Sequence, residues 1–274
     1  MVSVNTNIGA YVALQNLNAT NKQLEETQAH INTGLKVASA KDNGGIYAIA
    51  QNLRGDLGSY NAISQSLDRA KSAVDVAISA GESVSDLLVE LKQKAVAAAD
   101  ASLDSASRDA LNEDFKSLRD QIGTIVQNAA FNGVNLLDGS LTDIQAIANA
   151  DASSHITVSA ESFSYGGSVL SLTASQDIST QSAASVTLAT ISTDLASVNE
   201  ALARLGTGSK KLELHQTFVS KLSDTIKAGI GNLVDADLAS ESALLQSLQV
   251  KQQLGIQALS IANQAPQTLL SLFR

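Results

Sequence analysis

The chain has 274 residues, of which 44% are hydrophobic and 3% aromatic, and it carries one proline, no cysteine and a net charge of −9. Alanine accounts for 41 residues, so the apolar volume suits closely approaching helices better than one large globular core. This composition argues against a conventional enzyme, and the absence of cysteine excludes disulfides and thiolate chemistry. The acidic pI near 4.7 argues against nucleic acid as the main partner.

The first half of the chain is predicted to be helical. Apolar spacing predicts a helix over residues 5–35, which ends at Gly34 and a turn signal over 42–45. A second helix is expected over residues 57–100, and a third over 105–129 with a partial cap at its first residue.

Turn signals and a polar segment follow the third helix. Asn132-Gly133 and Asp138-Gly139 flank a short apolar run. Serine and threonine then occupy 18 of the 44 positions from 150 to 193. Short strands joined through Gly166-Gly167 are expected there, on the strength of Ile156, Val158, Val169 and Leu172.

Helical spacing returns in the last third of the chain. One helix is predicted over residues 183–228, with Gly229 and Gly231 interrupting it. The last helix is expected from residue 235 to the end, with Pro266 as a kink. The fold class is therefore mainly α, with a small β-hairpin or loop region in the middle.

Both ends of the chain carry narrow apolar stripes. Leu17, Leu24 and Ile31 recur every seven residues, which is typical of a coiled-coil seam. The companion heptad position is occupied by Leu14, Asn21, Gln28 and Leu35. A second stripe near the other end consists of Leu254, Ala258, Ile261, Ala265, Leu269 and Leu272. The two stripes are expected to pair, although each could instead cover only the chain's own domain.

The ends also lack charge. The first charged side chain is Lys22, and residues 252–273 carry none. The C-terminal stretch is too polar for a membrane span, and the N-terminus lacks the basic region of a cleaved secretory signal. Burial against other chains is therefore the better explanation. Residues 120–203 carry no Lys or Arg and eight Asp or Glu, so this acidic middle is expected to face water.

No catalytic, cofactor or metal site is predicted. His30, His155 and His215 are far apart and show no metal-ligand spacing. Gly206-Thr207-Gly208 lacks the spacing of a phosphate loop, and we interpret it as a helix interruption. Asp235, Asp237 and Glu241 could form an acid/base group, but capping and the helix dipole explain them more simply.

Three separated motifs resemble bacterial flagellin. Residues 31–45 read INTGLKVASAKDNGG, similar to the family's Leu-Ser-Ser-Gly-x-Arg-Ile followed by Ala-x-Asp-Asp-Ala-Ala-Gly. The segment 131–139, with Phe131, Asn132, Gly133, Asp138 and Gly139, is similar to Phe-Asn-Gly-x-x-Leu-Leu-Asp-Gly. The C-terminal signature is matched by Asp235, Asp237, Glu241, Asn263 and Pro266. The chain departs from the family at Thr33, Asn43 and Gly44, and it lacks large variable outer domains.

The resemblance implies five segments. Residues 1–40 and 233–274 would form an inner coiled-coil domain, and 41–140 and 183–232 an outer helical domain. Residues 141–182 would be an exposed β or loop-rich segment.

The resemblance also implies a function. The chain would be a secreted, self-assembling subunit of the extracellular flagellar filament, which drives swimming and is exported unfolded by a type III route. Implied partners are further copies, sibling flagellins, an export chaperone, the filament cap and hook-associated proteins. A hook–filament junction protein is the alternative in the same export class. A zinc peptidase is a second alternative, although the chain has no HExxH motif.

Two further expectations come from the family. Flagellins often carry O-linked sugars, for which the nominal candidates are Ser162, Ser164, Ser168, Ser171 and Thr173. Flagellins sensed by Toll-like receptor 5 present a segment resembling Leu-Gln-Arg-Val-Arg-Glu-Leu. Here Glu90 stands at the first arginine and Lys94 at the final leucine, and the two share a helix face on which an i,i+4 ion pair can form.

Overall fold

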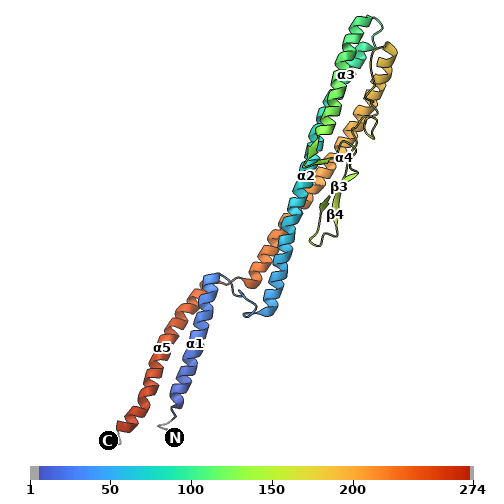
Figure 1. Cartoon of the computed structure of the whole chain (residues 1–274). Helices are drawn as coiled ribbons and strands as arrows, with labels where there is room; N and C mark the ends of the chain where they lie inside the picture. Colours follow the sequence, from blue (N-terminus) through green and yellow to red (C-terminus); the bar gives the residue numbers. More distant parts are fainter. Residues whose placement is uncertain (1–5, 272–274) are drawn as a thin grey trace. The chain divides into compact units, whose positions relative to one another are not determined.

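The computed structural model describes residues 6–271, and for residues 265–271 it describes the backbone alone. It divides into two compact units. The terminal unit comprises Met1–Gly55 and Thr225–Arg274, and the central unit comprises Asp56–Asp224. The expected mainly α fold with a small β region is confirmed (Figure 1).

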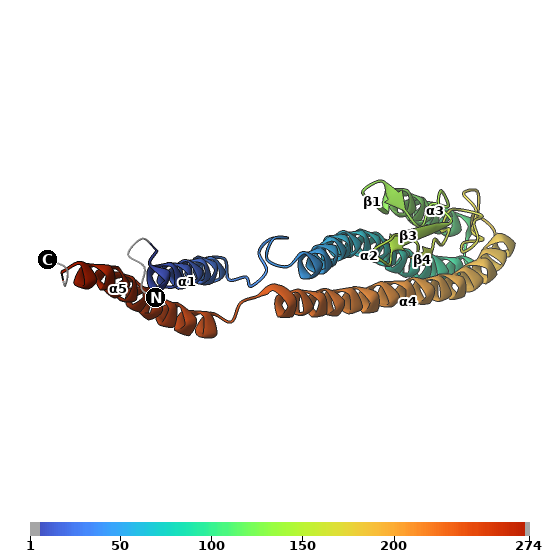
Figure 2. The same ribbon diagram turned by 90° about the horizontal axis from the view of Figure 1, so that it is seen from below.

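The terminal unit contains α1 (Ile8–Thr33) and α5 (Leu238–Ser271), which lie side by side (Figures 1 and 2). Helix α1 begins where Asn7 Oδ1 accepts the backbone N–H of Ala10 at 3.0 Å. It ends at Gly34, whose φ of 70° and N–H bond to His30 O form a left-handed C-cap. The predicted first helix is confirmed to within a few residues at each end.

Helix α2 (Gly44–Ala98) begins 13 residues earlier than predicted. The turn signal at 42–45 is in fact a helix start, because Asn43 Oδ1 accepts the N–H of Ile46 at 3.0 Å. Before it, Asp42 Oδ2 accepts the N–H groups of Ala38 and Ser39 at 3.0 and 2.8 Å. These hydrogen bonds lower the pKa of Asp42, and the bond from the Ser39 N–H has the largest effect.

Helices α3 (Ser105–Asn128) and α4 (Gln181–Val234) pack with α2 in the central unit (Figure 2). The N-cap of α3 is Asp104, one residue before the predicted partial cap, and its Oδ1 accepts the N–H of Ser107 at 2.9 Å. The largest fully buried side chains of this core include Leu67, Leu88, Leu91, Phe115, Ile122, Phe163 and Ile191.

Two antiparallel hairpins complete the central unit. β1 (Ala130–Phe131) and β2 (Val134–Asn135) are joined by Asn132 and Gly133, both with positive φ, as a type I′ turn requires. β3 (Asp143–Ile147) pairs with β4 (His155–Ser159), with Ile144 opposite Val158.

The second predicted pair of strand residues was wrong. Val169 and Leu172 are buried but lie in no strand, and Gly166-Gly167 joins no strands. The reason is a buried carboxylate on α4: Asp194 accepts the N–H of Ser171 at 2.8 Å and of Leu172 at 2.9 Å. Ser171 and Leu172 therefore donate to a side chain and not to a neighbouring strand, while Val169 donates to Ser162 O at 3.1 Å.

Helix α4 is longer and more continuous than predicted. It runs through Gly206, Gly208, Gly229 and Gly231 without a break, so the interpretation of these glycines as interruptions was wrong. Gly208 instead permits close packing, because a Cβ there would lie 2.5 Å from Val158 Cγ1 on β4. Helix α5 likewise continues past Pro266, whose side chain lies outside the described residues.

The acidic middle does not all face water. Asp194 is fully buried, and Glu161 is 7% exposed. Glu161 accepts two hydrogen bonds from Arg204, at 2.6 and 2.8 Å. Both acids thus hold loop segments against α4. The net charge of residues 120–203 did not indicate this role.

Candidate assembly surface

The seam of α1 that faces α5 contains Leu17, Leu24 and Ile31, all half-buried as expected. Its companion positions are Ala13, Thr20 and Thr27, one residue earlier than predicted. Of the predicted companions, Leu14 is 42% exposed and Gln28 is exposed, whereas Asn21 is half-buried and contacts α5. Leu35 lies beyond the end of α1 and packs near Ile230 and Val234. The small side chains at the companion positions let the two helices approach closely. A leucine would not fit between them, so Leu14 lies at the edge of the contact.

The stripe of α5 that faces α1 differs from the predicted one. It consists of Glu241, Leu245, Leu248, Gln252, Gly255, Leu259 and Ala262, which repeat at steps of four and three. Gly255 permits the closest approach, because a Cβ there would lie 3.2 Å from Leu17 Cδ1. The predicted stripe lies on another face: Leu254 is 58% and Ile261 69% exposed, and Ala258 is exposed.

The described members of the predicted α5 stripe, Leu254, Ala258 and Ile261, therefore do not face α1. The side chains of Ala265 and Leu269 lie outside the described ones, and Leu272 lies outside the described residues altogether.

Polar contacts fix the antiparallel register of α1 and α5. Asn7 Nδ2 donates to Ala262 O at 2.7 Å near one end of the pair. Gln252 Nε2 donates to Asn21 Oδ1 at 2.8 Å in the middle. His30 Nδ1 lies 3.0 Å from Glu241 Oε1 near the other end. These contacts lie at intervals along the pair, so a shift by one heptad would break all of them.

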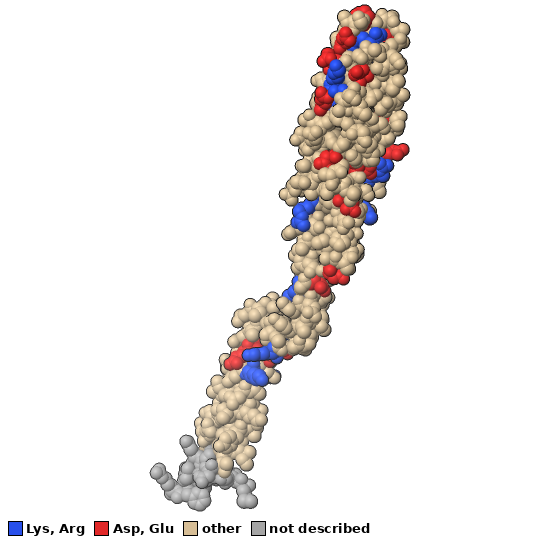
Figure 3. Space-filling view, turned by 45° about the vertical axis from the view of Figure 1, so that its right-hand side comes forward, with Lys and Arg blue, Asp and Glu red and all other residues tan. Residues whose placement is uncertain are grey.

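The remaining surface of the pair is unusually apolar. We define the outer apolar face as the exposed large hydrophobic side chains of α1 and α5, namely Ile8, Tyr11, Val12, Leu14, Leu238, Leu244, Val250, Leu254, Ile256 and Ile261. No charged residue occurs in 6–21 or 252–264, and the face seen in Figure 3 is correspondingly free of charge there. Exposed apolar surface of this extent marks an interaction site.

The three acids of the C-terminal motif lie just before α5 and in its first turn. Asp237 caps α5 by accepting the N–H of Ala239 at 3.0 Å, and Asp235 pairs with Leu35 in an isolated bridge. Glu241 contacts His30, so the three acids do not form an acid/base group. Asn263 is exposed on α5.

The other motif residues lie in the central unit. Phe131, Asn132 and Gly133 form the tight hairpin, and Phe131 is 37% exposed. Asp138 Oδ1 accepts the N–H of Ser140 at 2.8 Å, and Gly139 has a φ of 77°. The motif thus encodes two turns.

Lys94 pairs with Asp114 and not with Glu90. Lys94 Nζ lies 2.6 Å from Asp114 Oδ2 on α3, which places its ammonium between two helices. Glu90 is exposed on α2.

The sugar candidates differ in environment. Ser164 Oγ donates to Asp138 O at 2.7 Å, and Ser162 is half-buried against Gly139 and Gly167. Ser168, Ser171 and Thr173 are exposed.

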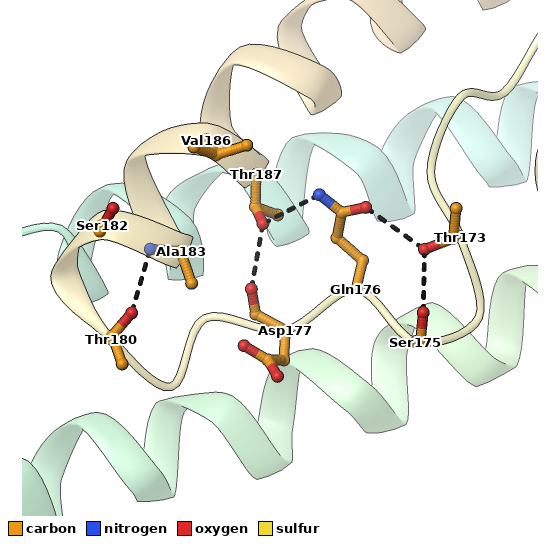
Figure 4. Close-up of a pocket in the computed structure, with 9 residues that line it drawn as sticks. All are labelled: Thr173, Ser175, Gln176, Asp177, Thr180, Ser182, Ala183, Val186 and Thr187. Carbon is orange, nitrogen blue, oxygen red and sulfur yellow. Dashed lines mark hydrogen bonds between the residues drawn. The ribbon is translucent and has the colours of Figure 1, made fainter.

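A hydroxyl-lined cavity of about 490 Å³ lies where α4 begins (Figure 4). Gln176 Nε2 donates to Thr187 Oγ1 at 3.2 Å, and Thr187 Oγ1 donates to Asp177 O at 3.0 Å. These bonds tie the preceding loop to α4. The one acid of the lining, Asp177, accepts from Ser179 at 3.0 Å, so the cavity presents no acid/base pair.

Several structural polar residues were not singled out from the sequence. Asn112 Oδ1 accepts the N–H of Ile178 at 2.9 Å, and Arg119 Nη1 donates to Gln176 O at 2.7 Å. Asp194 could have been found from the sequence, because its spacing places it on the buried stripe of α4 that includes Ile191 and Val198. An acid at a core position of a helix indicates a buried hydrogen-bond acceptor.

The described residues show neither a metal cluster nor a membrane-spanning helix. Within the described part of the chain, no group of three or more His, Cys, Asp or Glu residues could hold a metal ion. Among the described residues, no helix is both long and apolar enough to cross a membrane.

Comparison with known families gives two matches. A model of the bacterial flagellin N-terminal helical region matches residues 4–142, and one of the C-terminal helical region matches residues 188–273. Flagellin FljM of Caulobacter vibrioides is 54% identical over 272 residues, which cover 99% of this chain and 98% of the relative. A flagellin of Brucella melitensis is 38% identical and is aligned over 100% of both chains.

Two solved structures share the fold. Bacillus cereus flagellin has a TM-score of 0.50 at 21% identity, over 56% of this chain and 88% of that one. A putative flagellar hook-associated protein from Vibrio parahaemolyticus has a TM-score of 0.57 at 16% identity, over 71% and 100%. At these identities the structures show the fold alone, whereas the sequence matches show the family. The chain belongs to the bacterial flagellin family.

Proposed function

We propose that this chain assembles into the flagellar filament through the outer apolar face of its α1–α5 pair. The observation that carries the proposal is that each helix uses one stripe for its partner and leaves further large apolar side chains exposed. Burying one such Leu or Ile fully is worth about 1.5–3 kcal/mol, so several together strongly favour association. Contacts between different patches of identical subunits produce a helical filament when the rotation between neighbours does not close into a ring.

Substitution of one exposed apolar residue tests this proposal. Leu254→Glu places a charge at a side chain that is 58% exposed in the monomer, so the monomer should fold normally. In a subunit contact the same charge would be desolvated without a partner, and filament growth should fall at least tenfold. The measurement is filament length and number by electron microscopy of purified protein at high concentration.

Gln253→Glu is the matched control, because it adds the same charge to the neighbouring exposed polar position. It should polymerise nearly as the unsubstituted chain does. Equal polymerisation of both variants would show that Leu254 does not lie in a subunit contact.

The family also bears on the alternatives. The relatives are flagellins, and nothing favours the hook–filament junction alternative. The family is structural, and its filament is extracellular. We further propose secretion by the flagellar type III route, with sibling flagellins, an export chaperone, the filament cap and hook-associated proteins as partners. These proposals rest on the family resemblance.

We propose that any O-linked sugar is carried by Ser168, Ser171 or Thr173, because these candidates are exposed and Ser164 is held by Asp138. The expected result is an intact mass of the native filament protein above that of the 28.3 kDa chain. Alanine at the three positions together should return the mass to the unmodified value. A native mass equal to that of the unmodified chain would contradict the proposal.

We also propose that the monomer is a poor agonist of Toll-like receptor 5. Glu90 reverses the charge expected at a contact arginine, a change often worth about 2 kcal/mol or more at an interface. Lys94 is held by Asp114 and presents no apolar group. In a cell reporter assay, the monomer should need a much higher concentration than a conventional enterobacterial flagellin. Glu90→Arg with Lys94→Leu should restore part of the response, and equal potency of the unsubstituted chain would contradict the argument.

A further inference from the structure

The chain contains two Asn-Gly pairs, and the structure holds them differently. Asn43-Gly44 lies where α2 begins, and Asn132-Gly133 forms the turn between β1 and β2. A glycine after asparagine has no side chain to obstruct its backbone nitrogen, so the nitrogen can reach the asparagine side chain. Such pairs can lose the side-chain nitrogen as ammonia without an enzyme, provided that the local fold allows the attack.

Two hydrogen bonds restrain the Asn43-Gly44 pair. Asn43 Oδ1 accepts the N–H of Ile46 at 3.0 Å, and the Asn43 carbonyl oxygen accepts the N–H of Tyr47 at 2.9 Å. The first bond fixes the side chain, and the second fixes the peptide unit that joins Asn43 to Gly44. Attack by the Gly44 nitrogen on Asn43 Cγ therefore requires that the cap of α2 is broken.

The Asn132-Gly133 pair lacks these restraints. Within the described part of the chain, no hydrogen bond engages the Asn132 side chain, its carbonyl oxygen or the Gly133 N–H. Asn132 is exposed, and its hairpin pairs two residues of β1 with two of β2. The peptide unit between Asn132 and Gly133 can therefore rotate without the loss of a hydrogen bond.

Rotation of this peptide unit converts the type I′ turn into a type II′ turn. It changes ψ of the first turn residue from about +30° to about −120° and leaves its φ near +60°. Asn132 already has a φ of 49°, and Gly133 tolerates the new conformation because it has no Cβ. At ψ near −120° the Cα–Cβ bond eclipses the bond to the next nitrogen, as closure of a five-membered ring requires.

We propose that Asn132 is a site of spontaneous deamidation, which this rotation makes accessible from the native turn. The Gly133 nitrogen bonds to Asn132 Cγ, and the Cγ–Nδ2 bond breaks. The proton of the Gly133 nitrogen leaves with the amide group as ammonia, and a five-membered succinimide remains. Water then opens the ring at Cγ to give aspartate, or at the main-chain carbonyl carbon to give isoaspartate. Water is the only co-reactant, and no atom is oxidised or reduced.

The two products differ in their effect on the hairpin. Aspartate followed by glycine also favours a type I′ turn, so this product keeps the turn. Isoaspartate adds a methylene group to the main chain, so the two-residue turn no longer fits the register of β1 and β2. Either product adds a negative charge to a cavity of about 190 Å³, whose described lining includes Arg69 and no acid. The charge of this surface therefore changes as the protein ages.

Peptide mapping of the full-length chain by mass spectrometry tests this inference, with Asn43 as the matched control in the same molecule. The folded chain is incubated in mildly alkaline buffer, and the amide, aspartate and isoaspartate forms at residues 43 and 132 are quantified over time. Residue 132 should convert roughly twofold to thirtyfold faster, the factor by which a cap of this kind restrains Asn43. Equal or slower conversion at residue 132 would overturn the inference.

The same chain in guanidinium chloride shows whether the fold causes the difference. The cap of α2 and the hairpin are both lost there, so the two Asn-Gly pairs should convert at similar rates. A ratio of rates that is the same in denaturant as in the folded chain would mean that neighbouring residues set it, and would overturn the inference. Both measurements use the monomer, so their outcome is independent of the proposed filament function.

Discussion

A chain that lacks residues 252–274 is expected to remain a soluble monomer and to form no filaments. The deletion removes Gln252, Gly255 and Ala262, which contact Asn21, Leu17 and Asn7 across the α1–α5 pair. It also removes Leu254, Ile256 and Ile261 from the outer apolar face. Residues 6–21 of the chain would then lose the partner helix that orders them.

Two measurements on this truncated chain separate assembly from folding. Electron microscopy at high concentration should show no filaments, while circular dichroism should retain most of the helical signal from the central unit. The full-length Gln253→Glu variant serves as the assembling control. Long filaments of the truncated chain would show that neither the register contacts nor the outer apolar face is needed for polymerisation.

The sequence predicted the helices of the terminal unit better than their pairing. Helix α1 has one dominant apolar repeat, so Leu17, Leu24 and Ile31 could be placed in the seam. Helix α5 has two repeats with this spacing, and the one with the larger apolar side chains at Leu254 and Ile261 faces away from α1. The actual seam includes Gly255 and Gln252, because the contact depends on close approach and hydrogen bonding. A pattern of hydrophobic residues reveals neither the close approach at Gly255 nor the hydrogen bond of Gln252.

In the central unit, short sequence motifs predicted turns correctly. They did not predict the structure at positions where contacts with distant residues determine it. Asn132-Gly133 was identified as a turn because its conformation follows from the two residues themselves. Gly208 was misinterpreted, because its role depends on Val158, which is 50 residues away in the chain. The non-strand conformation of Leu172 similarly depends on a carboxylate on α4. Pairings of this kind cannot be derived from spacing along one segment.

The carboxylate of Asp194 is expected to be the largest single polar contribution to the stability of the central unit. It is fully buried and accepts the N–H groups of Ser171 and Leu172 at 2.8 and 2.9 Å. Asp194→Ala would leave two backbone donors without an acceptor, at about 1–3 kcal/mol each. The expected loss is about 2–6 kcal/mol in the free energy of unfolding, with a fall in Tm of roughly 4–24 °C.

Asp151→Ala is the control that separates burial from hydrogen bonding. Asp151 also accepts a backbone N–H, from Ser153 at 3.3 Å, but it is exposed, so water can replace it. Its substitution should change the free energy of unfolding by less than about 0.5 kcal/mol. Asp194→Asn keeps the shape with one acceptor oxygen and should fall between the two. If urea unfolding of the monomer gives Asp194→Ala the same midpoint as Asp151→Ala, the loop at residues 162–172 is held by its buried apolar side chains, and the carboxylate is dispensable.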